Sequence, residues 1–403
     1  MENTKTVDER KQQRFYRFYH ILKVIAGPVC RFFFGIRKED EIKLPEEPCL
    51  IVANHTCYFD PLIIAMCVDQ PLYFVAGENL QRQKVAAFAA MKIFHCISCS
   101  KGKISVQTIR EIARNLKAGH NVNMFAEGNI TYDGTTAPLN LVNGKLFRSL
   151  QCTVVTINIT GGYQIVPRWS GRFCRGTIHA ELKGVYTREQ LHDMTPEQVL
   201  EHVNRDIYAE QPPVEETDGR VYRRGAKGIH YVLYVCPVCG ALGRIMGKGK
   251  TILCGSCGKT WQYNEHGKIE GGLFQTIYQW NRWQKAHIKE MIQQKAPIEI
   301  STPKARLMSI MDNHSRQVRA LGTLLMNGEK LVCGDVEFAL RDISRMDTRN
   351  KGIILFSLQN GDYFEINTRK GFSGLMYKTV FETFKECGSR VEWYIYDGTD
   401  EFI

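Results

Sequence analysis

A short apolar run followed by a capped helix start constrains the fold of this chain more than any other stretch. The run Cys49–Ala53 predicts a buried strand, and Asp60-Pro61 predicts a helix that begins with a capping carboxylate and a proline. His55 lies in the turn between them, five residues before Asp60. In such a turn the Asp60 carboxylate can accept a hydrogen bond from one imidazole nitrogen, which leaves the other nitrogen free to take a proton from an alcohol. The stretch therefore predicts a general base at the end of a strand.

A second motif indicates the reaction in which this base would act. Asn54-His55-x-x-x-x-Asp60 is followed about seventy residues later by Phe125-Ala126-Glu127-Gly128. The two motifs and their spacing resemble the first and third motifs of the glycerophospholipid acyltransferases, and the likeness runs from roughly residue 40 to 210. The resemblance implies transfer of a fatty acyl group from acyl-CoA or acyl-ACP to a hydroxyl of a lysophospholipid. The first expected acceptor is 1-acyl-glycerol-3-phosphate, which would give phosphatidic acid.

The resemblance also assigns roles to single residues. His55 becomes the general base and Asp60 the side chain that orients it, while backbone N–H groups near the His55 turn would stabilise the oxyanion of the thioester. Lys101 is the best match to the arginine of the second family motif; Lys103 is the other candidate for phosphate contact, and a solvated basic loop is the alternative. No catalytic metal is required. The residues expected to bind substrate are Asn54, Lys101, Phe125, Glu127, Gly128 and Asn129.

One departure from the family pattern leaves the acceptor open. Ile130 stands where the family usually carries an arginine that meets the acceptor phosphate. An apolar side chain cannot form a charge-assisted, bidentate contact with phosphate. The acceptor is then either lysophosphatidic acid, held through Lys101, or a lysolipid with another headgroup. Arg168 is a further candidate for contact with a phosphate.

The pattern from residue 49 to 180 predicts an α/β fold, because short apolar runs alternate with helical stretches. This fits the mixed sheet flanked by helices that the resemblance implies for residues 41–210. It places His55 and Glu127 after the C-terminal ends of neighbouring strands, where open α/β sheets bind ligands. The expected strands are Cys49–Ala53, Leu72–Ala76, Val122–Phe125 and Thr153–Ile159, and the expected helices are Gln83–Ile93 and Ser105–Ala118.

Residues 1–40 predict an amphipathic segment that associates with a membrane. Aromatic and aliphatic residues are interspersed with Arg14, Arg17, Lys23 and Arg31, whereas the uninterrupted apolar piece Val24–Cys30 is far shorter than the roughly 20 residues of a spanning helix. Such a segment suits the headgroup layer of an anionic membrane, although a helix packed on the core of its own domain is the alternative. Gly27-Pro28 predicts a bend or a break in either case.

Composition is that of an ordinary globular protein, with 44% apolar and 24% charged residues, and the formal charge of +11 favours an acidic partner. No cleavable signal peptide opens the chain, because residues 1–14 are polar throughout. We therefore expect a peripheral or monotopic protein on the cytoplasmic face of a membrane. Most of the fourteen cysteines, such as Cys49, Cys67 and Cys152, lie in apolar runs where cysteine behaves as a small core residue.

Four cysteines have the spacing of metal ligands. Cys236-x-x-Cys239 and Cys254-x-x-Cys257 are separated by fourteen residues, and a glycine follows each pair. Four thiolates with no open position suit a structural Zn²⁺, with a redox pair as the main alternative. The pattern predicts a polar linker at residues 211–228, followed by a zinc ribbon over residues 229–265. The folding of this ribbon is expected to depend on the metal.

The rest of the chain predicts a helix and then strands. Residues 270–297 read as an amphipathic helix, expected to clamp the ribbon onto the catalytic domain rather than lie on a membrane. Residues 298–403 are β-rich and end in a helix at Gly374–Cys387. Asn327-Gly328 and Asn360-Gly361 are hairpin-turn dipeptides. This arrangement looks like the pleckstrin-homology or GRAM-like domains.

A second function class competes with acyl transfer. The chain could be a zinc-ribbon protein that binds nucleic acid or a protein partner and carries an inactive acyltransferase domain. Ile130 supports this alternative, whereas the retained His55, Asp60 and Glu127 oppose it. Nucleic acid is not the expected partner, although the basic loop around Lys248 and the aromatic residues of the ribbon, Tyr231, Tyr234 and Trp261, leave it open.

Overall fold

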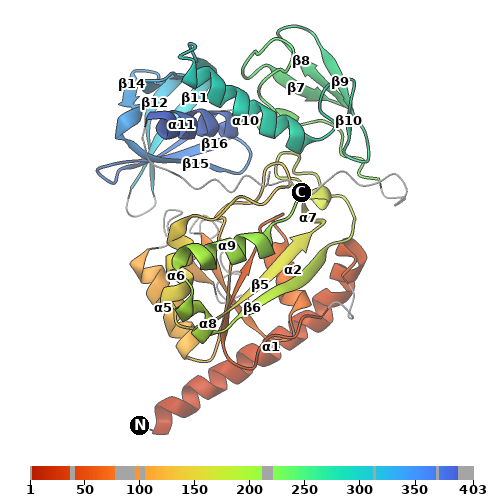
Figure 1. Cartoon of the computed structure of the whole chain (residues 1–403), viewed down its shortest axis with the longest axis vertical. Coiled ribbons are helices and arrows are strands. Elements are labelled where there is room, and N and C mark those ends of the chain that lie inside the picture. Colours follow the sequence, from red (N-terminus) through yellow and green to blue (C-terminus); the bar gives the residue numbers. More distant parts are fainter. Residues whose placement is uncertain are drawn as a thin grey trace. The chain divides into compact units, whose positions relative to one another are not determined.

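The chain folds into two compact units in a computed structural model (Figure 1). The first comprises Met1–Pro167 and Phe173–Gln211, and the second comprises Arg168–Arg172 and Pro212–Ile403. The structure describes residues 2–36, 41–77, 96–99, 105–210, 221–311, 315–368 and 372–388.

A six-stranded sheet forms the centre of the first unit, in the order β3-β2-β4-β1-β5-β6. Strands β1 to β5 pair in parallel, and β6 pairs antiparallel with β5. The predicted mixed sheet is therefore confirmed. The strands are β1 (Cys49–Ala53), β2 (Leu72–Gly77), β3 (Ile97–Cys99), β4 (Asn121–Met124), β5 (Thr153–Thr160) and β6 (His179–Tyr186). The predicted helix Gln83–Ile93 lies outside the described residues.

One layer of helices covers the sheet through a continuous apolar core. Alternate residues of β1, Leu50 and Val52, pack in this core with Ile112 of α5, Phe147 of α6 and Val203 of α9. Helices α1 and α2 contact each other outside this layer (Figure 1). The helices are α1 (Glu2–Phe34), α2 (Asp60–Cys67), α5 (Val106–Lys117), α6 (Leu141–Ser149), α7 (Gly162–Ile165), α8 (Arg188–Asp193) and α9 (Pro196–Ile207).

Helix α1 packs on its own unit along one side. Phe15, Tyr19, Cys30 and Phe34 are buried, and the Tyr19 hydroxyl donates a hydrogen bond to the carbonyl of Ala65 in α2 at 2.9 Å. The helix continues through Pro28, so the expected break does not occur. Among the described residues, no helix combines the length and the apolar character needed to cross a bilayer.

The described residues of the second unit form two sheets and two longer helices. The smaller sheet has the order β10-β9-β8-β7, and the larger has the order β14-β13-β12-β11-β17-β16-β15. Both predicted hairpins are present, because β12 pairs with β13 and β16 pairs with β17 in antiparallel fashion. The elements are η4 (Ile229–Tyr231), β7 (Ile245–Lys248), β8 (Thr251–Cys254), β9 (Thr260–Tyr263), β10 (Ile269–Glu270), α10 (Ile277–Gln293), β11 (Ile300–Ile310), β12 (Arg316–Met326), β13 (Lys330–Cys333), β14 (Val336–Ala339), η5 (Leu340–Asp342), β15 (Ile343–Arg349), β16 (Ile353–Leu358), β17 (Tyr363–Thr368) and α11 (Gly374–Gly388).

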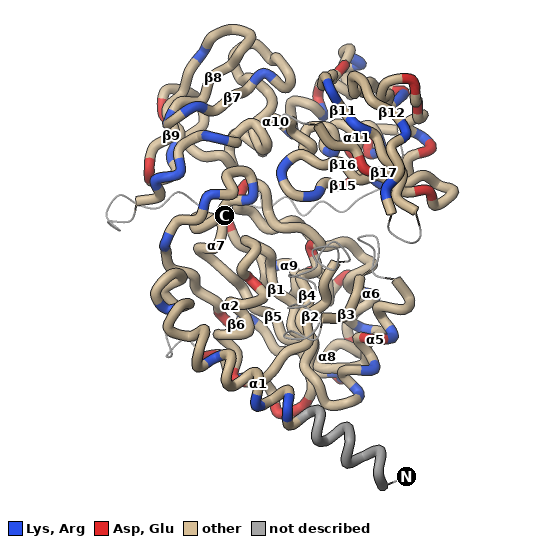
Figure 2. Tube along the Cα trace, turned by 180° about the vertical axis from the view of Figure 1, so that it is seen from behind, with Lys and Arg blue, Asp and Glu red and all other residues tan. Residues whose placement is uncertain are grey.

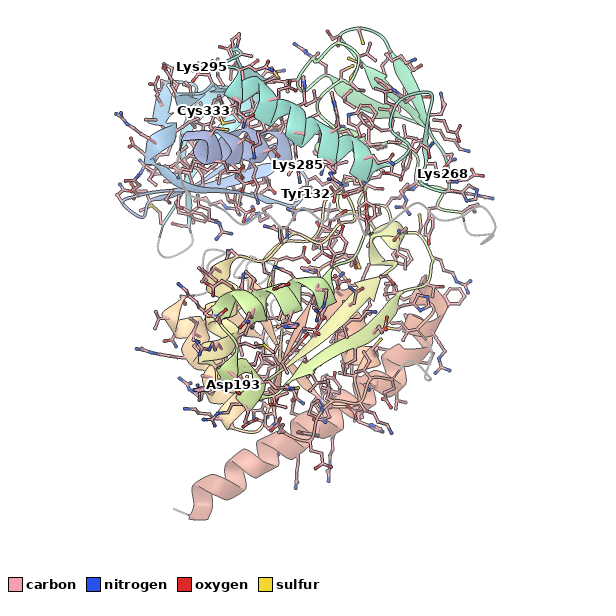
Figure 3. All side chains as sticks on the ribbon, in the orientation of Figure 1. Tyr132, Asp193, Lys268, Lys285, Lys295 and Cys333 are labelled. Atoms are coloured by element: carbon pink, nitrogen blue, oxygen red, sulfur yellow. The ribbon has the colours of Figure 1, made fainter. Side chains whose placement is uncertain are left out.

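Helix α10 holds the segment that leads into the first cysteine pair. The indole N–H of Trp280 donates to the carbonyl of Val235 at 2.9 Å, and the side-chain oxygen of Gln284 accepts the N–H of Tyr234 at 2.9 Å. The hydroxyl of Tyr234 bonds Thr379 of α11 at 2.9 Å. Within the second unit, α10 therefore holds the segment before the first cysteine pair, and Tyr234 of this segment bonds α11. The expected clamp of the ribbon onto the catalytic domain stays a prediction. Lys285 on α10 and Lys295, just past its end, are labelled in Figure 3.

Candidate active site and candidate metal centre

The turn between β1 and α2 brings His55 and Asp60 together. Asp60 is the first residue of α2 and its side chain is completely buried, whereas the His55 side chain is 18% exposed. The Nδ1 atom of His55 lies 2.7 Å from Oδ2 of Asp60. This hydrogen bond fixes the proton on Nδ1, so that Nε2 is the nitrogen that can accept one. The geometry expected from the sequence is present.

Asp60 also organises the turn itself. Its Oδ2 accepts the backbone N–H groups of Thr56 and Cys57, and its Oδ1 accepts the Thr56 hydroxyl at 2.8 Å. A buried carboxyl group that accepts this many hydrogen bonds is fixed in place, and as a carboxylate it can stabilise an imidazolium. Thr56 and Cys57 were missed by the sequence analysis. The available signal was their position, four and three residues respectively before an aspartate that starts a helix.

Gly162 of α7 makes room for this arrangement. A Cβ atom at residue 162 would lie 2.0 Å from the Thr56 hydroxyl oxygen, a distance that no packing tolerates. The glycine therefore permits the α7 backbone to approach the turn, and any side chain there would push Thr56 away from Asp60.

An aromatic ring supports the imidazole from the neighbouring strand. Phe125 follows β4, and its ring lies parallel to that of His55, with centroids 4.2 Å apart and an interplanar angle of 18°. Stacking limits rotation of the imidazole, so the hydrogen bond to Asp60 and the stack together define the ring's orientation. The contact of Phe125 is thus with the imidazole of His55, and contact with substrate stays a prediction.

Glu127 is tied to the backbone on both sides. Its Oε1 accepts the N–H of His55 at 2.6 Å, and its Oε2 accepts the N–H of Ala137 at 2.7 Å. Burial raises the pKa of Glu127 from 4.5 to about 8; the two backbone N–H groups lower this pKa but do not offset the burial. Asp60 and Asp133 raise it further through their negative charge.

These bonds correct one expectation about the oxyanion. The N–H of His55 is donated to Glu127, and those of Thr56 and Cys57 are donated to Asp60. The N–H of Gly128 is likewise donated, to the carbonyl of Phe125. These four amides of the two motifs are committed within the protein, so they are not the donors that an oxyanion would need.

Four further residues were predicted to bind substrate, and the structure describes three of them. The amide of Asn54 donates to the carbonyl of Ile159 at 2.8 Å and accepts its N–H at 2.7 Å, so it bridges the turn to β5. Gly128 adopts φ +70°, which favours glycine, and Asn129 follows it in the same loop. Lys101 lies outside the described residues. Substrate binding by all of them stays a prediction.

Arg168 has a structural role in the second unit. Its side chain is buried and donates to the carbonyls of Asn350 at 2.8 Å and Thr348 at 2.9 Å. These contacts fix the turn between β15 and β16. The expectation that Arg168 meets an acceptor phosphate therefore finds no support.

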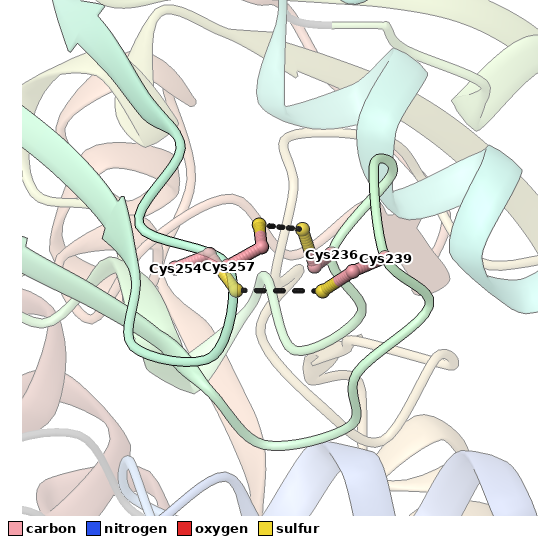
Figure 4. A group of neighbouring side chains, drawn as sticks. All are labelled: Cys236, Cys239, Cys254 and Cys257. Carbon is pink, nitrogen blue, oxygen red and sulfur yellow. Dashed lines mark hydrogen bonds between the residues drawn. The ribbon is translucent and has the colours of Figure 1, made fainter.

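The four cysteines converge on one point (Figure 4). Their sulfur atoms all lie within 4.8 Å of one another, and the Cys236–Cys257 and Cys239–Cys254 pairs are each separated by 3.8 Å. A tetrahedron with metal–sulfur distances of about 2.3 Å has sulfur–sulfur edges of about 3.8 Å, far longer than the roughly 2 Å of a disulfide. The donor set therefore fits Zn²⁺ and not two disulfides.

The glycine after each cysteine pair has the conformation that the tight turn requires. Gly240 has φ +69° and Gly258 has φ +74°. Their N–H groups return to the carbonyls of Cys236 and Cys254 at 2.9 and 3.0 Å. This part of the prediction is confirmed.

The aromatic residues of the ribbon are mostly interior. Tyr234 and Trp261 are 1% and 3% exposed, so their rings cannot stack on nucleic-acid bases without rearrangement. Lys250 of the basic loop pairs with Glu265 at 2.7 Å. These contacts give the proposed nucleic-acid surface no support.

The described part of α1 carries an apolar stripe on its exposed side. Ile21, Ile25 and Val29 are 54%, 68% and 53% exposed and lie at helical spacing, and Phe32 continues the row. Lys and Arg recur along the same helix (Figure 2), and residues 13–34 contain no Asp or Glu. The helix therefore has a buried face and a second apolar face that is open to solvent.

A known family model matches the segment that contains this site. Residues 35–160, which contain both motifs, match the Acyltransferase family model, and this supports placing the domain in the acyltransferase superfamily. Among solved structures, the chain is similar to the crystal structure of the 1-acyl-sn-glycerophosphate (LPA) acyltransferase, PlsC, from Thermotoga maritima. The two share 19% identity over 43% of this chain and 67% of that chain, with a TM-score of 0.37. No match is found among curated proteins.

Proposed function

We propose that the chain is an O-acyltransferase that moves a fatty acyl group from acyl-CoA or acyl-ACP to a hydroxyl of a lysophospholipid. The observation that carries this proposal is the 2.7 Å hydrogen bond between His55 and the buried Asp60, inside a segment that matches the Acyltransferase family model. An alcohol is a weak nucleophile at neutral pH, and a base oriented in this way removes that obstacle.

The reaction follows from the orientation of the imidazole. Nε2 of His55 takes the proton of the acceptor hydroxyl while its oxygen attacks the thioester carbonyl carbon. The tetrahedral intermediate collapses, the carbon–sulfur bond breaks, and the imidazolium returns its proton to the leaving thiolate. Asp60 stabilises the imidazolium between these steps, and the base contributes roughly 10²–10⁴ in rate.

The acceptor we propose first is 1-acyl-glycerol-3-phosphate, with phosphatidic acid as the product. Ile130 cannot replace the phosphate-binding arginine of the family pattern, so a lysolipid with another headgroup is the second choice. Lys101 remains the proposed phosphate contact. Asn54, Phe125, Glu127, Gly128 and Asn129 remain the proposed surroundings of the substrates.

We further propose that α1 places the enzyme on the cytoplasmic face of an anionic membrane, where its lipid substrate resides. The exposed row of Ile21, Ile25 and Val29, together with a helix segment that is basic and free of acidic residues, supports this proposal. A structural Zn²⁺ held by Cys236, Cys239, Cys254 and Cys257 would stabilise the ribbon without entering the reaction.

An acceptor panel tests the function. The purified full chain is incubated with one long-chain acyl-CoA, or with the matching acyl-ACP, and a series of lysolipids, and the products are read by mass spectrometry. We expect a diacyl product from at least one acceptor. No product from any acceptor, combined with salt-dependent binding to DNA or RNA, would instead favour a zinc-ribbon binding protein with an inactive acyltransferase domain.

A further inference from the structure

The main chain of His55 is held from both sides by one loop. Its N–H donates to Oε1 of Glu127 at 2.6 Å, and its carbonyl accepts the N–H of Thr131 at 2.9 Å. The base is therefore fixed at its side chain by Asp60 and at its backbone by residues 127–131. A shift of this loop would move the imidazole relative to the acceptor.

The Thr131 side chain organises the loop that follows. Its hydroxyl donates to the carbonyl of Thr135 at 2.7 Å and accepts the N–H of Gly134 at 3.0 Å. These two bonds close residues 131–135 into a compact turn (Figure 3 labels Tyr132 in it). The turn leads directly to Ala137, whose N–H binds the second oxygen of Glu127 at 2.7 Å.

The far end of the turn is anchored to a regular element. The N–H of Thr136 donates to the carbonyl of Ala209 at 3.0 Å, and the N–H of Ala209 donates to the Thr136 hydroxyl at 3.0 Å. Residue 209 follows α9, so the turn is attached to the helix layer of the first unit. Thr131 itself is 8% exposed. The Thr131 hydroxyl thus links the segment anchored at Ala209 to the two hydrogen bonds that hold the N–H and the carbonyl of His55.

We propose that Thr131 is a positioning residue for acyl transfer. Its hydroxyl maintains the loop of residues 127–135, and this loop holds the His55 backbone through the Glu127 carboxyl group and through the N–H of Thr131. This inference rests on the proposed function and adds a residue to it. Thr131 need not touch substrate. Displacing a reacting group by about 1 Å can cost on the order of 10²-fold in rate, so a small shift of this loop would be visible in kcat.

Two substitutions separate the hydroxyl from the shape of the side chain. Thr131→Val keeps the branching and the backbone N–H but leaves the carbonyl of Thr135 and the N–H of Gly134 without their partner. We expect kcat to fall by about 10- to 100-fold with KM changed by less than about 3-fold. Thr131→Ser restores the hydroxyl, and we expect kcat within about 3-fold of wild type.

A matched control is Thr153, at the start of β5 in the central sheet of the same unit. Thr153 is also buried, and its hydroxyl donates to the carboxylate of Glu47 at the start of β5, the end opposite to the site. Thr153→Val makes the same chemical change, and we expect its kcat to stay within about 2-fold of wild type. Thermal unfolding of each variant shows whether it is folded, and Thr131→Ala provides a second deletion if valine disturbs folding.

A spectroscopic readout makes the test independent of turnover. The Nδ1 proton of His55, which bonds Asp60, should give a low-field proton resonance in wild type and Thr131→Ser. We expect this resonance to broaden or disappear in Thr131→Val. If no acceptor is acylated by wild type, the proposed function fails while the resonance still decides the inference. An unchanged resonance with unchanged kcat in Thr131→Val, or a Thr131→Ser variant as impaired as Thr131→Val, would overturn it.

Discussion

The ring of Phe125 lies flat against the imidazole of His55, with centroids 4.2 Å apart. The two residues come from neighbouring parallel strands, since β1 pairs directly with β4 and both side chains follow the ends of those strands. The sheet therefore places an apolar ring beside the imidazole of His55, although the two residues lie seventy positions apart in the sequence. The stack limits rotation of the imidazole from one face, and the Asp60 carboxylate holds the ring at Nδ1.

This stack predicts a graded effect of substitution at Phe125. Aromatic stacking contributes about 0.5–1.5 kcal/mol, so Phe125→Leu should lower kcat/KM by roughly 2- to 10-fold. Phe125→Tyr keeps the ring and should stay within about 2-fold of wild type. Steady-state kinetics with one acceptor measures both. Equal rates for the leucine variant and wild type would show that the stack has no part in orienting His55.

Glu127 predicts a specific pH dependence of stability. Because the pKa of Glu127 rises from 4.5 to about 8 on folding, the folded chain keeps a proton that the unfolded chain releases between these values. The contribution to stability is therefore complete below about pH 4.5 and is lost as the pH rises through about 8. Urea unfolding at a series of pH values measures this. In Glu127→Gln, which has no proton to release, the fall in the free energy of unfolding between pH 5 and pH 8.5 should be smaller. Parallel curves for the two proteins would contradict the assignment.

Removal of the metal should expose buried tryptophans of the second unit. Trp261 and Trp280 pack edge to face with centroids 4.8 Å apart, and both are at most 3% exposed. If Zn²⁺ supplies the folding energy of the ribbon, a chelator should shift tryptophan fluorescence to longer wavelength, and Cys236→Ser should lower the zinc content from one ion per chain. Cys174→Ser, outside the cluster, is the control. A full zinc content in Cys236→Ser would argue against the site.

The exposed stripe on α1 predicts membrane binding by apolar contact. Replacing Ile25 and Val29 by serine together removes two apolar side chains, each worth about 1.5–3 kcal/mol when fully buried. Partition onto vesicles of an anionic phospholipid should fall by about tenfold or more, as measured by co-sedimentation. Val238→Ser, at an exposed apolar position of the ribbon, is the matched control. Binding that is unaffected by the double substitution would remove α1 from the proposed membrane contact.

The sequence predicted the regular parts of the fold well. Strand β1 coincides with the predicted Cys49–Ala53, because this run is uninterruptedly apolar. Helix α5 begins after Ser105, whose hydroxyl caps it, as the predicted boundary indicated. Of the bend or break expected at Pro28, the break does not occur, since α1 runs through this residue: the helix is packed along one side by buried rings, and tertiary contacts outweigh one missing N–H.

The side-chain network of the site was only partly predictable. The pair His55 and Asp60 is encoded in five residues of sequence, so its geometry follows from one turn. The bond from Thr131 to the His55 backbone, by contrast, depends on how β4 lies against β1, and spacing along the chain carries no signal for it. The same holds for Gly162, which is required only because α7 passes close to Thr56.

The most direct measurement compares thioester-dependent acylation by purified wild type and His55→Ala, with Asp60→Asn beside them and Asp193→Asn, at an exposed position on α8, as control (Figure 3). We predict that His55→Ala loses nearly all activity while it still folds and holds zinc, and that Asp60→Asn loses about 10²-fold or more. Asp193→Asn should match wild type. Undiminished acyl transfer by a folded His55→Ala variant would contradict the account.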